Sequence, residues 1–546
     1  MPVSGTRSDC ASRRPPLALA LLGLLVAWPL AAAAQTPPAP PGVYVDTTYV
    51  PSTGQTLTVA AGGSLQAALN LAQPGDEIVL QAGATYTGQV TLPNKSGSGW
   101  ITIRSSALSS LPAAGTRVSP ADAASMPKIT ANLDPVISAD SGAHHYRFIG
   151  IEVVPTSGTY LYSLFDLGSY ATSSAMTPHH IIIDRCYLHG DPTAGTRRGV
   201  AMNGANLAVI DSYLADFKEL GGDSQAIAGW NGPGPFKIVN NYLEAAAENL
   251  LFGGADPSIA NLVPSDVEIR LNHMTKPLAW KADDPSYAGT PWQVKNLLEL
   301  KNISRVLIDG NLFDYNWTAA QDGFAVLFTV RNQDGTAPWS IVSDVTFTNN
   351  IVRHSAGGVN ILGFDDTYPS QQAQRVLIQN NLFDDISSMP WGWNGILFQI
   401  LSGPDSVVFN HNTAMPGDLD VILADGTLPA TNFVFQNNIV GYGQYGIIGA
   451  NQAPGTSTLQ VFFPGAVVTK NVFAGGSLGL GVDPYPAGNV FLASFAQVGF
   501  TDFAGGNYRL LASSPCAGAA TDGSDIGMDV TALTAAISGA ATPPVP

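Results

Sequence analysis

The chain has 546 residues, of which 12% are charged, and its formal net charge is −17 at pH 7. A chain this acidic lacks the basic surface that phosphate backbones require, which excludes nucleic acid as the expected partner. Its three cysteines are too few for a fold that is held together by disulfide bonds.

Residues 1 to 34 have the features of a secretory signal. Three arginines precede the apolar run PLALALLGLLVAWPL, and Ala32 and Ala34 fit the small residues of a cleavage site. The apolar run is short and is interrupted by proline, so a retained membrane span is not expected. We therefore expect a secreted or periplasmic protein.

A proline-rich leader, residues 35 to 60, is expected to be extended. Behind it, Ser64 can cap a short helix that carries Leu65 and Leu69 on one face and stops at Pro74. A short amphipathic helix in this place is typical of a cap that covers the open end of a stacked β-structure.

A short apolar run that closes on an asparagine recurs through most of the chain. VLIDGNLF, VTFTNNIV and VLIQNNLF are examples, with Asn311, Asn350 and Asn381 in the shared column, and successive runs lie 26 to 39 residues apart. The runs are rich in β-branched residues and too short for helices, so the repeat predicts a stacked β-solenoid. We interpret the asparagine as the left-handed residue of a turn, with a side chain that forms a hydrogen-bonded ladder between coils.

This pattern resembles the right-handed parallel β-helix of the pectate-lyase-like superfamily. The resemblance implies an all-β, single-domain solenoid of about 11–13 coils over residues 61 to 530, with an N-terminal capping helix. Residues 505 to 530 are expected to complete the last coil, and residues 531 to 546 to form a short helix or tail. We expect a monomer.

Aligning the remaining apolar runs of successive coils predicts a row of charged side chains on the outer wall. Strand residues alternate between faces and coils stack about 4.8 Å apart, so in LLELKN, LFTVRN and ILGFDD the side chains of Lys301, Arg331 and Asp365 should form one vertical row. Glu299 should lie on the same face as Lys301. The side chains expected to point inward are Leu298, Leu300, Phe328, Val330, Leu362 and Phe364.

This row suggests a site for acidic polysaccharide. Repulsion between two neighbouring cations lowers the pKa of a lysine, which can then take a proton from the carbon beside a carboxylate that an arginine neutralises. Such chemistry cleaves uronic-acid polymers by β-elimination. The similarity to lyases of the alginate and chondroitin type implies Lys301 as base and Arg331 as its partner. Asp365 is a third catalytic candidate because it belongs to the same row. It also implies a calcium ion, for which Glu299 and Asp256 are the candidate ligands.

A long loop, residues 274 to 295, brings lysines and aromatic residues to one coil. Aromatic faces bind sugar rings and lysines attract uronates, and long ordered loops are often functional. The expected substrate-binding residues, in this loop and beyond it, are Lys276, Trp280, Lys281, Trp292, Asp366 and Trp391. The alternative is that the aromatic residues only pack the loop against its coil.

Other functions remain open at this level. Asp365 and Asp366 resemble the adjacent aspartates of polygalacturonase-like glycoside hydrolases, so hydrolysis by this pair is one alternative. A non-catalytic polysaccharide-binding or structural β-helix is another, in which the charged row is only a balanced surface. No metal-ligand spacing accompanies the histidines at 144, 145, 179 and 180, so a zinc site is not expected.

Overall fold

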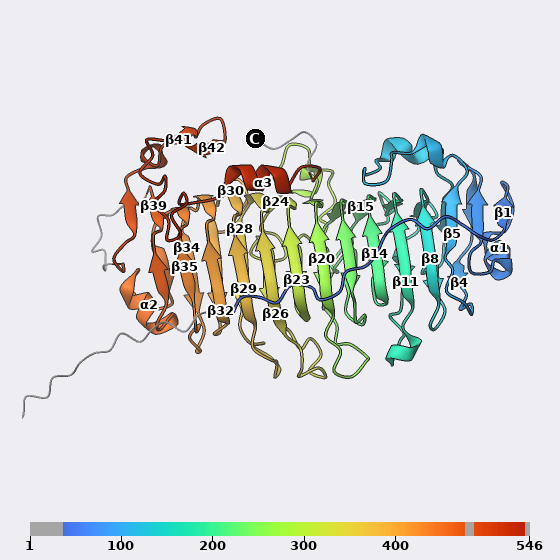
Figure 1. The fold of residues 1–546 in the computed structure, drawn as a ribbon, viewed down its shortest axis with the longest axis horizontal. Coiled ribbons are helices and arrows are strands. Elements are labelled where there is room, and N and C mark those ends of the chain that lie inside the picture. Colours follow the sequence, from blue (N-terminus) through green and yellow to red (C-terminus); the bar gives the residue numbers. More distant parts are fainter. Residues whose placement is uncertain (1–35, 476–484, 541–546) are drawn as a thin grey trace, which may run out of the picture. The chain divides into compact units, whose positions relative to one another are not determined.

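The computed structural model describes residues 36–475 and 485–540 of the chain. Over these residues the chain winds through three long sheets, named here A, B and C, in which all neighbouring strands are parallel (Figure 1). Successive coils place one strand in each sheet, in the order A, B, C. The predicted right-handed parallel β-helix is confirmed, whereas the predicted signal lies outside the described residues.

The strands are short and follow one another along each sheet in chain order. Sheet A contains β1 (Thr56–Val59), β2 (Glu77–Leu80), β5 (Ile101–Ser105), β8 (His144–Ile149), β11 (His179–Asp184), β14 (Ala205–Ile210), β17 (Phe236–Val239), β20 (Ser265–Arg270), β23 (Ile303–Asp309), β26 (Val342–Thr348), β29 (Gln374–Gln379), β32 (Asp405–Asn410), β35 (Val434–Gln436) and β38 (Val467–Thr469). Sheet B contains β3 (Thr85–Thr87), β6 (Lys128–Ala131), β9 (Glu152–Pro155), β12 (Tyr187–His189), β15 (Tyr213–Phe217), β18 (Tyr242–Ala245), β21 (His273–Thr275), β24 (Leu312–Asn316), β27 (Ile351–Ser355), β30 (Leu382–Ile386), β33 (Thr413–Pro416), β36 (Ile439–Gly441), β39 (Val472–Ala474) and β40 (Val490–Leu492). Sheet C contains β4 (Val90–Leu92), β7 (Ile137–Ala139), β10 (Leu161–Asp166), β13 (Thr196–Ala201), β16 (Gln225–Gly229), β19 (Glu248–Phe252), β22 (Asn296–Leu300), β25 (Phe324–Thr329), β28 (Gly357–Leu362), β31 (Ile396–Leu401), β34 (Asp420–Asp425) and β37 (Gly446–Gly449).

Apolar side chains from all three sheets fill the interior as one continuous core. In sheet C, Leu298 lies beside Val326, which lies beside Val359, and all three are fully buried. Each coil thus stacks its apolar residues on those of the coil before, so the core lengthens one coil at a time.

The predicted asparagine ladder runs through the turns between sheets A and B. Asn272 donates from its backbone N and its side-chain Nδ2 to Asn311 Oδ1, each at 3.0 Å, and Asn311 donates in the same way to Asn350 Oδ1, at 2.9 and 3.0 Å. We had expected the ladder asparagine to be the left-handed residue. In the structure the residue before it is left-handed instead, such as Gly310 (φ 67°) or Asn349 (φ 53°). The preceding residue makes the turn, which leaves the asparagine side chain free to point inward and join the coils.

Three short α-helices flank the solenoid: α1 (Leu65–Leu71), α2 (Thr456–Phe462) and α3 (Val530–Ala536). Helix α1 is the predicted cap, since Ser64 Oγ accepts a hydrogen bond from Ala67 N and Leu65 and Leu69 are buried against the first coils. None of the described helices has the length and apolar character needed to cross a membrane.

The leader, from residue 36 to about residue 50, crosses the strands of sheet A as an extended strap (Figure 1). Asp344 Oδ1 accepts a hydrogen bond from Ala39 N at 3.0 Å, and Asp266 Oδ1 accepts one from Gly42 N at 2.8 Å. Val45 is buried against Ile182 of strand β11. The leader is therefore extended, as expected, and is also part of the packed structure.

The end of the chain folds back over the outside of the solenoid instead of completing the last coil. After the antiparallel pair β41 (Phe500–Asp502) and β42 (Asn507–Leu510), residues 511–540 run back along the turns that precede sheet B. Ile526, Leu533 and Ile537 cover outward apolar residues of sheet B. We call residues 498–540 the C-terminal strap. The strap protects a row of apolar side chains that the solenoid leaves outside its core.

Candidate functional site

An open cavity of about 390 Å³ lies on the outer wall of sheet C, at strands β22, β25 and β28. Its polar lining consists of positively charged, negatively charged and neutral side chains: Glu299, Lys301, Gln321, Asp322, Thr329, Arg331 and Asn360. Lys301 and Arg331, thirty positions apart in the sequence, lie in the wall of this one cavity. Arg331 N also donates a hydrogen bond to the backbone oxygen of Lys301 at 3.0 Å.

The strand register that places these residues differs from the predicted alignment. Leu298 lies beside Val326, where the alignment had placed Phe328. A slip of two residues keeps every side chain on its face, so Phe328 and Val330 still point into the core. Strand β28 is shifted against strand β25 by an odd number of residues relative to the alignment. Its side chains therefore point to the faces opposite to those predicted.

The prediction was therefore wrong for Leu362 and Phe364. Ile361, not Leu362, joins the core beside Phe328, and Phe364 lies half-buried beyond the end of the strand. The corner loops of each coil set its register, and alternation of apolar residues alone does not reveal that offset.

Lys301 and Glu299 form an ion pair at the floor of the cavity. Lys301 Nζ lies 3.4 Å from Glu299 Oε1, and the two side chains are 15% and 3% exposed. Glu299 Oε2 accepts a hydrogen bond from Asn296 Nδ2 at 3.3 Å, and Oε1 accepts one from Thr329 Oγ1 at 3.5 Å. These contacts fix the carboxylate and leave the lysine ammonium at the side that opens to the cavity.

Arg331 is held by two carboxylates from the next coil. Its Nη1 donates to Asp365 Oδ1 at 3.1 Å and also to Asp366 Oδ1. Asp365 Oδ2 accepts a further bond from Asn332 N at 2.7 Å, and its side chain is 2% exposed. Although partial burial favours the neutral acid, the hydrogen bond from Arg331 lowers the pKa of Asp366. Both aspartates thus position the guanidinium, so the structure speaks against a catalytic carboxylate at Asp365 and against hydrolysis by the Asp365–Asp366 pair.

A second charged group lies one coil before the cavity. Lys295 Nζ lies 2.5 Å from Asp223 Oδ1 and 3.5 Å from Glu248 Oε1. Burial raises the pKa of the Glu248 carboxyl to about 7, and the negative charges of Asp223 and Glu299 act in the same direction. Gln225 Nε2 donates to Glu248 Oε2 at 2.7 Å.

The sequence did carry a signal for this group. The first outward positions of four consecutive strands, which pair in register, are all polar: Arg198, Gln225, Glu248 and Asn296. The aligned runs began with LLELKN, at residue 297, and so left these four residues out.

The loop residues predicted to bind substrate are packed into the protein. Trp280 and Trp292 are 6% and 8% exposed and pack with Trp317. Lys218 Nζ lies 5.4 and 5.3 Å from the centres of the Trp280 and Trp292 rings. The aromatic residues of the loop therefore hold it against its coil, which was the alternative interpretation.

The two predicted lysines of the loop are also unavailable for an incoming uronate. Lys276 is 1% exposed, and its Nζ lies 2.9–3.0 Å from five oxygen atoms that can share its three hydrogens, four of them backbone carbonyls and the fifth Asn249 Oδ1. Lys281 is 6% exposed and pairs with Asp283. The Lys276 ammonium is therefore enclosed by protein oxygens and stabilises the corner of the coil.

Trp391 is likewise buried, with 7% of its surface exposed. Its Nε1 donates to Asp385 Oδ2 at 2.8 Å, and its ring packs edge-on against Tyr315 at 5.6 Å. His354 Nδ1 contacts the same carboxylate oxygen at 2.9 Å. Trp391 is therefore held by contacts within the protein, and its role in sugar binding stays a prediction.

The predicted calcium ligands do not converge. Asp256 is not part of the cavity, and its Oδ2 accepts hydrogen bonds from Thr336 N and Oγ1 at 2.7 and 2.8 Å, which fixes the turn at residues 334–336. Glu299 is already paired with Lys301, and Lys295 supplies positive charge between Asp223 and Glu248. Calcium needs six or more oxygen ligands, so these residues do not fit the ion and no step of the proposed reaction uses it.

No protein-family model matches the chain, and no curated protein matches it. Among solved structures, it is similar to the catalytic unit of a thermostable GH87 α-1,3-glucanase from Streptomyces thermodiastaticus strain HF3-3, with 12% identity, 79% of this chain and 70% of that chain covered, and a TM-score of 0.45. It is also similar to the pectate lyase Pel9A, with 13% identity, coverage of 87% and 96%, and a TM-score of 0.36.

A third similar structure is the PL6 family alginate lyase AlyGC, with 13% identity and a TM-score of 0.48. The similarity covers 90% of this chain but 59% of that one, less than two thirds of its length. The pairing of strands in sheets A, B and C defines the fold independently of these similarities. The chain is a right-handed parallel β-helix protein. The right-handed parallel β-helix that the resemblance implied is thus confirmed.

Proposed function

We propose that this β-helix protein is an exported, carbohydrate-active lyase that cleaves a uronic-acid polymer by β-elimination at the cavity of sheet C. The observation that carries the proposal is that Lys301 and Arg331 share one open, polar cavity on the outer wall. The chain is acidic overall, so an acidic polymer needs local positive charge to approach it. The polar side chains of Thr329, Asn360 and Gln321 suit the hydroxyl groups of sugars.

In the proposed reaction, the Arg331 guanidinium binds the uronate carboxylate and stabilises the charge that develops on it. Lys301 Nζ, which must first give up the proton that it holds in the ion pair with Glu299, removes the proton from the carbon beside that carboxylate. The bond from the next carbon to the glycosidic oxygen then breaks, which leaves a carbon–carbon double bond in the ring. The leaving oxygen takes up the proton that Lys301 carries, and Glu299 Oε1 accepts a hydrogen bond from the transient ammonium.

A second candidate is binding without catalysis. Asp365 and Asp366 already neutralise part of the charge on Arg331, which weakens its hold on a uronate. Under this candidate the cavity holds a sugar residue of a polymer, and no bond is cleaved.

The test is a panel of uronic-acid polymers incubated with the purified protein, with the ultraviolet absorbance of the unsaturated product as readout. We expect turnover on one polymer class and a fall in kcat of about 10²–10⁴-fold in Lys301→Ala, because general base catalysis contributes that much. Lys95→Ala, a lysine near the capping helix, is the matched control and should keep full activity.

Two results decide between the candidates. Full turnover by Lys301→Ala would show that another group is the base. Absence of unsaturated product on every polymer, combined with retained binding of one of them, would support the binding candidate.

A further inference from the structure

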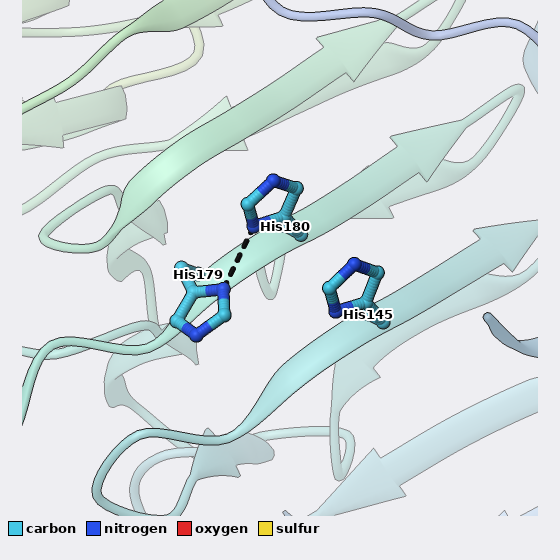
Figure 2. A group of neighbouring side chains, drawn as sticks. All are labelled: His145, His179 and His180. Atoms are coloured by element: carbon cyan, nitrogen blue, oxygen red, sulfur yellow. Dashed lines mark hydrogen bonds between the residues drawn. The ribbon is translucent and has the colours of Figure 1, made fainter. Parts of the chain in front are cut away.

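Four histidines from two neighbouring coils lie together at the start of strands β8 and β11 in sheet A. His144 pairs with His179 in the ladder, and the residues that follow them are His145 and His180. The rings of His144 and His179 stack with their centres 4.8 Å apart, and those of His145 and His180 stack at 4.6 Å. Figure 2 shows that His145, His179 and His180 face a common space on the outer side of these strands.

The backbone explains why consecutive histidines share one face. In a regular strand, neighbouring side chains point to opposite faces. His145 and His180 have left-handed conformations, with φ of 61° and 55°, which interrupt this alternation. The two rings of each pair therefore meet: His144 Nδ1 lies 2.8 Å from His145 Nδ1, and His179 Nδ1 lies 2.7 Å from His180 Nδ1.

The same row of sheet A carries complementary charges in later coils. The left-handed residues that correspond to His145 and His180 in four later strands are Asp266, Arg305, Asp344 and Arg375. These form ion pairs between coils, Arg305 with Asp266 at 2.7 Å and Arg375 with Asp344 at 2.6 Å. At His145 and His180, by contrast, like groups are stacked, and the ion pair between these two strands, Arg147 with Asp184 at 2.7 Å, lies further along them.

Imidazole in its neutral form is a metal ligand. Burial lowers the pKa of His145 to about 4, and the neighbouring imidazoles act in the same direction; the pKa values of His179 and His180 are lowered for the same reasons. Among the residues that the structure describes, His145, His179 and His180 are the one group of three or more histidine, cysteine or acidic side chains with ligand atoms all within 4.8 Å of one another.

We propose that His145, His179 and His180 form a binding site for a divalent first-row transition metal ion of the kind that prefers imidazole, such as Zn²⁺ or Cu²⁺. His144 stands beside them, with its Nδ1 2.8 Å from His145 Nδ1. Both Nδ1 atoms of a pair can bind the ion when the ring that donates between them carries its proton on Nε2 instead, and the ion links the coil of β8 to the coil of β11. This corrects the expectation that these histidines lack metal-ligand partners, because the repeat brings together two pairs that lie 35 positions apart in the sequence.

The distances suit such an ion after rotation of the rings. A zinc–nitrogen bond of about 2.0–2.1 Å in a tetrahedral site separates two ligand nitrogens by roughly 3.4 Å. The paired Nδ1 atoms are closer than this, and the most distant ligand atoms are farther apart. Rotation about the side-chain torsions moves a ring nitrogen by about the difference between the present separations and the one that a tetrahedral zinc site needs. The rings are half-buried, so they have solvent on one side into which they can turn.

The test uses the full-length folded protein, freed of metal by chelation and then titrated with Zn²⁺ in a calorimeter. We expect one ion per chain, and an affinity lower by about 10–100-fold or more in His145→Asn and in His180→Asn. His189→Asn removes a histidine that pairs with Glu152 outside the cluster and should bind Zn²⁺ as the wild type does. Ca²⁺ should not bind at this site, because it prefers oxygen ligands.

A second measurement does not depend on the variants. Cu²⁺ added to the wild-type protein should give an electron paramagnetic resonance spectrum with hyperfine splitting from imidazole nitrogens. Zn²⁺ should also raise the Tm of the wild type, because an ion that binds only the folded state stabilises it. No saturable binding to the wild type, or unchanged affinity in both cluster variants, would overturn the proposal. A variant that fails to fold leaves the decision to the copper spectrum.

Discussion

At the scale of single residues, burial changes what a charged side chain does. Lys276 and Lys281 looked like surface cations in the sequence, but protein atoms enclose both of them. Lys301 and Arg331 keep solvent-facing positions because they lie at the end of a strand or just beyond it, where the wall of sheet C opens into the cavity. A lysine therefore has a structural role where it is enclosed in a corner of the coil, and it is available for chemistry where it lines the cavity of sheet C.

Asp420 gives a pH-dependent prediction at this scale. It is 2% exposed at the start of strand β34, its Oδ1 has no hydrogen-bond partner among the described atoms, and burial alone raises its pKa to about 7. The unfolded chain ionises this group near its ordinary pKa of 3.8. Between about pH 4 and pH 7 the folded state therefore holds the extra proton, so the free energy of unfolding falls as pH rises through this window.

We expect Asp420→Asn to be more stable than the wild type by roughly 3 kcal/mol at pH 8 and to differ little from it at pH 4. Urea unfolding of both proteins at the two pH values measures this difference. Asp425→Asn, at the exposed end of the same strand, is the control and should leave the pH dependence unchanged. Equal stability of Asp420→Asn and the wild type at pH 8 would contradict the prediction.

At the scale of elements, the asparagine ladder joins the coils and the left-handed residues make their turns. Each ladder asparagine satisfies polar groups in two neighbouring coils, which an apolar residue could not do. In sheet A, a second row of left-handed residues carries ion pairs in four coils and the histidine cluster in two others. One backbone device thus holds two different chemistries, because a left-handed residue turns its side chain outward in each of these six coils.

Asn311 lies in the middle of the ladder and tests its contribution. Its Nδ2 donates to Ile269 O at 2.9 Å as well as to Asn350, and its Oδ1 accepts two bonds from Asn272. Asn311→Ala leaves buried donors and an acceptor unpaired, and we expect it to lower the free energy of unfolding by about 3–5 kcal/mol.

Thermal and urea unfolding followed by circular dichroism measure this loss. Asn94→Ala is the matched control, because Asn94 is exposed and donates one side-chain bond, to Ser141 O. It should lower stability by less than about 1 kcal/mol. A ladder variant no less stable than this control would show that the coils do not depend on the asparagine.

At the scale of the described molecule, the solenoid stands largely by itself and two straps cover its outer surface. Within residues 36–540, the leader crosses sheet A and the C-terminal strap covers the turns beside sheet B. Stacked coils contact only their neighbours, so loss of a strap should open local surface and leave the rest of the solenoid intact.

Leu533→Asp tests the C-terminal strap. Leu533 is 3% exposed, within the apolar cluster that covers Leu312, Ile351 and Leu382. A buried, unpaired carboxylate there should detach the strap, so we expect protease cleavage within residues 498–540 to become at least about tenfold faster. The circular dichroism of the β-helix should stay unchanged.

Leu511→Asp places the same charge at a leucine that is 45% exposed, and it should be cleaved at the wild-type rate. Equal cleavage rates in the two variants, or collapse of the entire β-sheet signal in Leu533→Asp, would contradict the proposed independence of strap and solenoid.

The sequence by itself determined the repeat, the parallel β-helix, the asparagine ladder and the capping helix. Each of these follows from local periodicity, which recurs in every coil and is read directly from the chain. It also indicated Lys301 and Arg331 as neighbours, because an even slip in register keeps the faces of a strand. Tertiary structure alone decided that Ile361 and not Leu362 enters the core, that Lys276 and Trp292 are buried, and that four histidines meet. These features depend on the offset that each corner loop gives its coil and on contacts between distant segments, and periodicity contains neither.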